Sequence, residues 1–164
     1  MTGARRWWWL AGTALVAALV TGCGGGKDAP TETRLLELRP VVGSDEPPCD
    51  GAPAEGDVIV RPETKDGRTL ACLRLGPAVV DDRDVRSAGL GETPGGPAVQ
   101  IVLGRAGSAN LDNFAARNLG KRMAILVRDK VLRAPTVSSS GFLGRIELIG
   151  LSQEEASGLA RDLG

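Results

Sequence analysis

The sequence has no histidine and no tyrosine, and its three tryptophans stand together at Trp7, Trp8 and Trp9. Phe114 and Phe142 are therefore the only aromatic residues beyond that cluster. Stacking sites for bases or sugars need aromatic faces, so sites of that kind are disfavoured. A serine or cysteine nucleophile would lack its usual imidazole base, and a zinc site would lack its commonest nitrogen ligand. The composition therefore predicts no catalytic residue, no cofactor and no metal.

An excess of charge of either sign is also lacking, because 20 basic residues balance 20 acidic ones. Arg5 and Arg6 precede Cys23, so the chain after that cysteine carries 18 basic against 20 acidic residues, a net charge of −2. With no excess of positive charge, we expect no phosphate-binding surface and no nucleic-acid partner. A length of 164 residues fits one globular domain with a leader and a linker.

The first 22 residues have the pattern of an export signal. Arg5 and Arg6 give a positive start, the eleven residues 10–20 are apolar, and two small residues follow. A transmembrane helix needs about 20 apolar residues, so an uncleaved membrane anchor is the weaker alternative. Residues 19–23 (LVTGC) resemble the lipobox of bacterial lipoproteins, whose cysteine accepts a diacylglyceryl group. We expect a signal peptide over 1–22 and a lipid anchor at Cys23 on the extracytoplasmic face of the cell membrane.

Cysteine is scarce, with three in the chain. If Cys23 carries lipid, Cys49 and Cys72 remain as a pair, and an exported pair is usually oxidised. A disulfide that closes a loop of about 24 residues would stabilise a small domain by roughly 3 kcal/mol. The alternative is two separate buried thiols, and a redox role is disfavoured because no C-x-x-C spacing is present.

The N-terminal part of the mature chain divides into a tether and a first group of strands. Residues 23–33, the lipidated cysteine and a polar segment rich in glycine, predict a flexible tether. Residues 34–74 are expected to hold strands over 34–42, 58–60 and 69–75, with Pro40 marking an edge strand or a strand end. Between them, residues 43–57 predict a loop held by Cys49, and residues 65–67 predict a turn.

Residues 75–164 are expected to form the main domain. Helices are predicted over 82–89, capped by Asp81 or Asp82, from Ser108 to Gly120, and after a capping box at 152–155. Strands are predicted over 98–103, 123–127, 131–137 and 143–149, the middle two as a hairpin. This order predicts a two-layer α+β fold, with helices packed on one face of a largely antiparallel sheet.

Three segments follow one another along this domain: 118–125 (NLGKRMAI), 131–135 (VLRAP) and 150–156 (GLSQEEA). They resemble the head subdomain of the large periplasmic region of SecD, a membrane component that assists protein export. The resemblance runs from about residue 75 to 163 and implies the SecD head fold and contacts with extended polypeptide or other envelope proteins. Where that family usually has Asp-Gly, this chain has Arg128-Asp129, which predicts a looser or longer turn. The sequence has no multi-span membrane region, so we do not expect the proton-driven motor of SecD.

Several motifs are better explained by structure than by chemistry. The glycines at 89–96 include Pro94 where a dinucleotide fingerprint needs glycine, so they predict a loop. The charged residues 81–86 predict a solvated helix face, and residues 138–140 predict a polar serine loop. Residues 104–107 predict a connection from a strand to the helix that Ser108 caps. Two surfaces are candidates for partner binding: an exposed strand edge, which can add a peptide strand, and the strand 131–137 with the loop after it.

Two function hypotheses from different classes follow. The first is a non-catalytic, membrane-anchored extracytoplasmic lipoprotein that binds proteins, is related to SecD and is accessory to protein export. Its partners would be exported polypeptides or Sec translocon components. The alternative is a structural or assembly lipoprotein of the cell envelope with no link to secretion, because a fold does not fix a function. An enzyme is the least supported reading, and the sequence does not set the oligomeric state.

Overall fold

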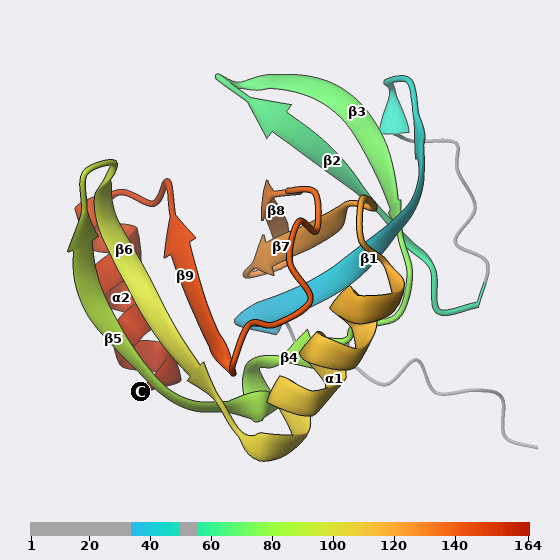
Figure 1. The fold of residues 1–164 in the computed structure, drawn as a ribbon. Helices are drawn as coiled ribbons and strands as arrows, with labels where there is room; N and C mark the ends of the chain where they lie inside the picture. The colour runs from blue at the N-terminus through green and yellow to red at the C-terminus, as the bar shows by residue number, and fades with distance from the viewer. Residues whose placement is uncertain (1–33, 50–55) are drawn as a thin grey trace, which may run out of the picture. The chain divides into compact units, whose positions relative to one another are not determined.

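The structure, a computed structural model, describes residues 34–49 and 56–164 (Figure 1). The described residues form one compact unit. The expected signal peptide, tether and lipid anchor at Cys23 lie outside the described residues. Strands from 34–74 pair with strands from 75–164, so these two expected regions form one folded unit and not two.

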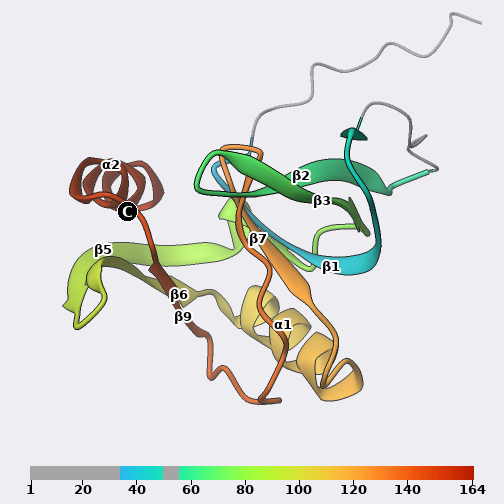
Figure 2. The same cartoon turned by 90° about the horizontal axis from the view of Figure 1, so that it is seen from above.

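The described strands form two antiparallel sheets, which two helices accompany (Figures 1 and 2). The larger sheet has the order β2-β3-β1-β7-β8, with β4 paired to β1, and the smaller has the order β5-β6-β9. The predicted α+β class with antiparallel strands is confirmed, and its strands divide between two sheets. The elements are β1 Leu36–Asp45, β2 Ile59–Lys65, β3 Arg68–Leu75, β4 Val80–Asp81, η2 Asp82–Asp84, β5 Val85–Thr93, β6 Gly96–Leu103, α1 Arg105–Arg117, β7 Met123–Val127, β8 Lys130–Arg133, β9 Arg145–Ile149 and α2 Gln153–Leu163.

One hydrophobic core joins both sheets to both helices. The strand predicted over 98–103 is confirmed as part of β6, in which Val99, Ile101 and Leu103 are all buried. The predicted capping box is also confirmed. The Ser152 hydroxyl accepts a hydrogen bond from the Glu155 amide, and the Glu155 carboxylate accepts one from the Ser152 amide. The fully buried side chains of the helices, each at 0 % exposure, are Leu111 and Ala115 of α1 and Ala156 and Leu159 of α2. The helices thus hold the two sheets around a shared interior.

A second hydrophobic cluster lies under the larger sheet. It contains Leu73, Leu75, Ala124, Leu126 and Val131. Ion pairs tie β2 to the β7–β8 hairpin over this cluster: Arg61 Nη2 lies 2.7 Å from Asp129 Oδ1, and Arg122 pairs with Glu63. Strands β2 and β8, at the two ends of the strand order, are also in contact with each other.

Pro40 lies inside β1, so its expected place at an edge or a strand end is wrong. Residues before it pair with β7, whereas Val41 to Asp45 pair with β3. The Pro40 carbonyl accepts the Gly76 amide at 2.9 Å, in the connection between β3 and β4. The N–H that proline lacks would face the same connection, where no strand is present to use it. A central strand therefore tolerates this proline where it changes partners.

The expected helix over 82–89 is wrong, because Val85–Thr93 is strand β5 and pairs with β6 along its length. Only one 3-10 turn, η2, forms after Asp81. The Asp81 carboxylate accepts a hydrogen bond from the Arg83 amide at 2.9 Å, as the predicted cap requires. It also forms an ion pair with the Arg83 guanidinium. Gly89 and Gly91 disfavour a helix, and the long β6 partner outweighs the local capping signal.

Asp81 should make the stability of the protein depend on pH at acidic values. Its side chain is 11 % exposed, and its hydrogen bond with Arg83 lowers its pKa below 3.8, against an opposing effect of burial. A carboxyl with a lowered folded-state pKa stabilises the protein above its unfolded pKa, and that contribution is lost as pH falls through the folded value. Urea unfolding from pH 7 to 2 should therefore show a smaller loss of stability below pH of about 4 in Asp81→Asn than in the wild type. Asparagine can still cap the 3-10 turn, whereas alanine cannot. Asp81→Ala should therefore lose about 1 kcal/mol more of folding stability than Asp81→Asn at pH 7. Parallel pH curves for wild type and Asp81→Asn would contradict this role.

Two local features of the main domain differ from expectation. Helix α1 begins after Gly104, not at Ser108, and the Gly104 amide donates to the Asp84 carbonyl at 2.7 Å. A Cβ on Gly107 would lie 2.6 Å from the Asp84 Cβ, so glycine is what lets this acidic residue approach the first turn. The β7–β8 turn is a tight turn and not a looser one, because Arg128 and Asp129 both adopt positive φ, 47° and 67°. Two-residue hairpins require such angles, and here non-glycine residues adopt them.

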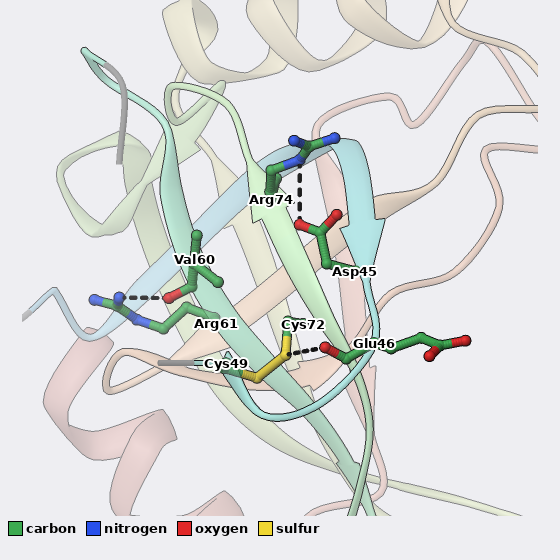
Figure 3. The surroundings of a disulfide bond; sticks show 7 residues. All are labelled: Asp45, Glu46, Cys49, Val60, Arg61, Cys72 and Arg74. Carbon is green, nitrogen blue, oxygen red and sulfur yellow. Dashed lines mark hydrogen bonds and ion pairs between the residues drawn. A yellow bond between two sulfur atoms is a disulfide. The ribbon is translucent and has the colours of Figure 1, made fainter. Parts of the chain in front are cut away.

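Cys49 and Cys72 form the predicted disulfide, with a Cα–Cα distance of 5.3 Å (Figure 3). Cys72 lies in β3 and is 1 % exposed. The bond joins the segment after β1 to β3, next to the Arg74–Asp45 ion pair (Figure 3). The disulfide therefore closes the far end of the larger sheet and is not part of the smaller one.

Candidate functional site

A pocket of about 280 Å³ opens between the two sheets. Its walls come from β1, α1, β7, β9 and the segment that follows β8, which Figure 1 shows running between β7 and β9. The apolar side chains among its lining are Leu38, Leu111, Met123, Ile125, Val137, Phe142 and Ile146. Sites for whole small molecules usually have 300–1,000 Å³, so this pocket suits one or two aliphatic side chains better than a cofactor.

The edge of β9 carries backbone groups that no described strand uses. The Leu103 amide donates to the Gly144 carbonyl at 2.8 Å, which fixes the alternation of the β6–β9 ladder. In an antiparallel ladder, residues of every second pair point both backbone groups away from the partner strand. Glu147 and Ile149 therefore turn N–H and C=O outward, as does the Arg145 carbonyl. The Arg145 amide is used locally, since it donates to the Phe142 carbonyl at 3.0 Å.

Two opposite charges flank the pocket on this edge. Arg145 and Glu147 both line it, and both side chains are exposed. Neither forms an ion pair with another residue in 34–49 or 56–164. Ile146 between them is half-buried and packs on the main core. The edge thus presents basic, apolar and acidic side chains in turn beside unused backbone groups.

The loop before β9 is held at both ends. The Asp112 carboxylate accepts the Phe142 amide at 2.8 Å, and Gly144 has a φ of 68°, which glycine tolerates. Between them, Leu143 has a φ of 52° and its side chain is 86 % exposed. A bulky residue in this conformation is strained, and strain of this kind is concentrated at functional sites.

Replacing Leu143 with glycine should stabilise the protein. The left-handed conformation costs a residue with a Cβ about 1–2 kcal/mol, and the greater freedom of glycine in the unfolded chain offsets part of that gain. We expect Leu143→Gly to raise the free energy of unfolding by about 0.5–1 kcal/mol, measured by urea titration. Leu143→Ala is the matched control, because it removes the exposed side chain and keeps the strain. Equal stability of the two variants would show that Leu143 is not strained.

The structure also places the other motifs considered from sequence. Ser138 and Ser139 line the pocket beside Val137, so the predicted serine loop belongs to the site, and the sequence has no histidine to activate a hydroxyl. The loop predicted over 89–96 is wrong for most of its length, because Gly89 and Gly91 lie in β5 and Gly96 begins β6. The solvated helix face predicted over 81–86 is also wrong: Asp81 ends β4 and pairs with Arg83, and Asp82 pairs with Arg34. Within 34–49 and 56–164 no group of three metal-ligating side chains occurs, and no helix is long and apolar enough to cross a membrane.

The sequence predicted an exposed strand edge without indicating which strand it is, and it did not show that this edge and the segment after residue 131 meet. The segment after β8 forms one wall of the pocket and the β9 edge forms another. Arg145 and Glu147 were not singled out, although the alternation of residues 145–149 indicates which side chains share a face. Their position at a sheet edge depends on the order β5-β6-β9, which local patterns do not encode.

The fold is an α+β domain with antiparallel sheets, and the sequence model of "SecDF, P1 head subdomain" matches residues 59–164. The chain therefore belongs to the SecDF P1 head subdomain family. The match begins 16 residues before the expected start at residue 75, because it includes the β2–β3 hairpin. A search of the curated proteins found no match.

Two solved structures share the fold. One is of SecDF, described as a membrane component that enhances protein export, with 24 % identity, a TM-score of 0.58 and coverage of 80 % of this chain. The other is SecDF in a super-membrane-facing form, with 26 % identity, a TM-score of 0.59 and coverage of 80 % of this chain. The matched regions make up 62 % and 18 % of those chains, respectively. This chain therefore corresponds to part of the length of each.

Proposed function

We propose that this chain is a non-catalytic extracytoplasmic protein-binding module, held to the membrane by lipid at Cys23 and accessory to protein export. Its ligand is an extended segment of polypeptide that adds to the edge of β9. The single observation that carries the proposal is the row of outward backbone groups from the Arg145 carbonyl to Ile149, which no described strand uses and which lies beside an apolar pocket.

The chemistry of this edge favours a peptide over other ligands. Backbone N–H and C=O groups spaced along a strand are matched by another extended backbone, and pockets beside the edge give side-chain specificity. The pocket lies at Ile146, so one side chain of an added strand would reach apolar surface. Unlike a small-molecule site, this arrangement recognises main chain and so accepts many sequences.

The family supports a role in export, since the SecDF structure of similar fold is described as enhancing protein export. The disulfide supports an extracytoplasmic location, because such bonds persist in oxidising compartments. The lipobox-like residues before Cys23 support anchoring, and two acyl chains are enough for a stable anchor. Together these features support a peptide-binding edge that is close to the membrane where exported chains emerge.

The proposal is tested by crosslinking in intact cells. A photoreactive residue in place of Glu147, at the proposed edge, should capture exported polypeptides that are still extended, or Sec components. The same residue in place of Thr69, exposed on β3, is the matched control and should capture far less. Equal recovery from both positions, or recovery from position 147 of mature envelope proteins alone, would contradict the proposal and favour a structural role in the envelope.

The anchor has its own test. Mass spectrometry of the protein purified from membranes should find the chain beginning at a diacylated Cys23. In Cys23→Ser the protein should keep the leader or leave the membrane fraction. An intact leader and an unmodified Cys23 in the wild-type protein would rule out the lipid anchor.

A further inference from the structure

We infer that the β9 edge prefers a particular three-residue pattern, basic–aliphatic–acidic from N- to C-terminus, in a peptide that binds antiparallel to β9. This inference rests on the proposed function and adds the chemistry of the ligand. It comes from the order of Arg145, Ile146 and Glu147 along the edge and from their surroundings.

Side chains directly opposite each other in a sheet lie on the same face and contact each other. A ligand residue opposite Ile146 therefore points toward the apolar pocket, whose walls include Leu111, Ile125 and Val137. With about 280 Å³ available, an aliphatic side chain fits there. Burial of apolar surface gives this position its contribution to binding.

Ligand residues on either side of that position lie on the opposite face, next to Arg145 and Glu147. Both side chains are exposed, and neither has an ion-pair partner among the residues that the structure describes. Cross-strand pairs of opposite charge stabilise a sheet and pairs of like charge destabilise it. An acidic ligand residue is therefore favoured opposite Arg145 and a basic one opposite Glu147.

The direction of the ligand follows from the backbone. Glu147 turns both its N–H and its C=O outward, and an antiparallel partner residue can satisfy both at once. The Arg145 amide is already bonded to Phe142, so only its carbonyl remains, which accepts one further ligand amide. In antiparallel order the residue opposite Glu147 comes first in the ligand, which gives the basic–aliphatic–acidic pattern.

Fluorescence anisotropy with labelled nine-residue peptides tests the inference on the mature protein. The central residues are Lys-Leu-Asp in one peptide, Asp-Leu-Lys in the second and Thr-Leu-Thr in the third, with identical flanks. We expect the first to bind about tenfold more tightly than the second at low salt, with the third between them. In the double variant Arg145→Glu/Glu147→Arg this order should reverse, because the charges on the edge exchange places.

Each other result has a defined meaning. Equal binding of all three peptides would overturn the charge pattern and leave peptide capture at β9 standing. Tighter binding of the second peptide by the wild-type protein would overturn the antiparallel direction. A preference unchanged in the double variant would show that other residues read the charges. Binding of none of the three would contradict the proposed function itself.

Discussion

Removing the disulfide by the double substitution Cys49→Ala/Cys72→Ala is expected to lower the free energy of unfolding by about 3 kcal/mol. The bond joins residues 23 positions apart, and without it the unfolded chain gains the freedom of that loop. Cys72 is 1 % exposed, and alanine is chosen as its replacement because it places no polar atom at this buried position. Differential scanning calorimetry should show a fall in melting temperature of roughly 10 °C.

The disulfide lies in the larger sheet and the proposed binding edge in the smaller one. Peptide binding by the double variant should therefore be unchanged well below its melting temperature. The same shift should appear when the wild-type protein is heated with a thiol reductant, and the reductant should not affect the double variant. A change in melting temperature of less than about 2 °C would mean that folding does not depend on this bond.

Leu111→Ala is expected to cost about 2–5 kcal/mol of stability, the usual range for a buried leucine. Leu111 is fully buried in α1 and belongs to the core that joins both sheets. It also lines the pocket, so its truncation should enlarge the pocket. The variant should therefore accept a peptide with phenylalanine in place of the central leucine more readily than the wild type does. Urea unfolding and peptide anisotropy measure the two effects.

Leu36→Ala is the matched control for this prediction. Leu36 is equally buried and belongs to the same core, but it does not line the pocket. It should lose a similar amount of stability and keep the wild-type preference for the central residue of the peptide. The pocket assignment would be wrong if both variants changed that preference alike.

Elements whose local signals agree with their tertiary setting could be predicted from the sequence. Helix α2 has a capping box at Ser152 and a stripe containing Ala156 and Leu159, and both signals describe its environment correctly. Strand β6 alternates buried and exposed residues, and the Asp66-Gly67 turn has the positive φ angles that two-residue hairpins need. In these places propensity, period and capping all favour the same structure.

Other elements could not be predicted because a distant partner decides them. Strand β5 follows a true capping residue, Asp81, and contains two glycines, yet eight of its residues pair with β6. Pro40 is tolerated in a central strand only because β3 and β4 are interrupted beside it. The binding edge depends on which strand is last in the smaller sheet, so its residues became visible only with the sheet order.

A SecDF head domain that carries its own lipid anchor would separate polypeptide binding from the membrane-spanning parts of SecDF. Edge addition uses main-chain groups and needs no catalytic residue. A weak, sequence-tolerant contact of this kind can hold an emerging chain and release it again. We propose that this is how the protein contributes to export.

Glu147→Pro gives the most direct measurement of the central claim, that a peptide binds by adding a strand to β9. Proline removes the outward N–H of Glu147, which the β6–β9 ladder does not use, so the fold should survive. Glu147→Ala is the control, since it removes the charge and keeps the N–H. Peptide affinity should fall at least tenfold more in Glu147→Pro than in Glu147→Ala, with similar melting curves for both. A peptide N-methylated at the residue opposite Glu147 should lose affinity for the wild-type protein in the same way. Equal affinity of two folded variants, with full binding of the methylated peptide, would contradict strand addition at β9.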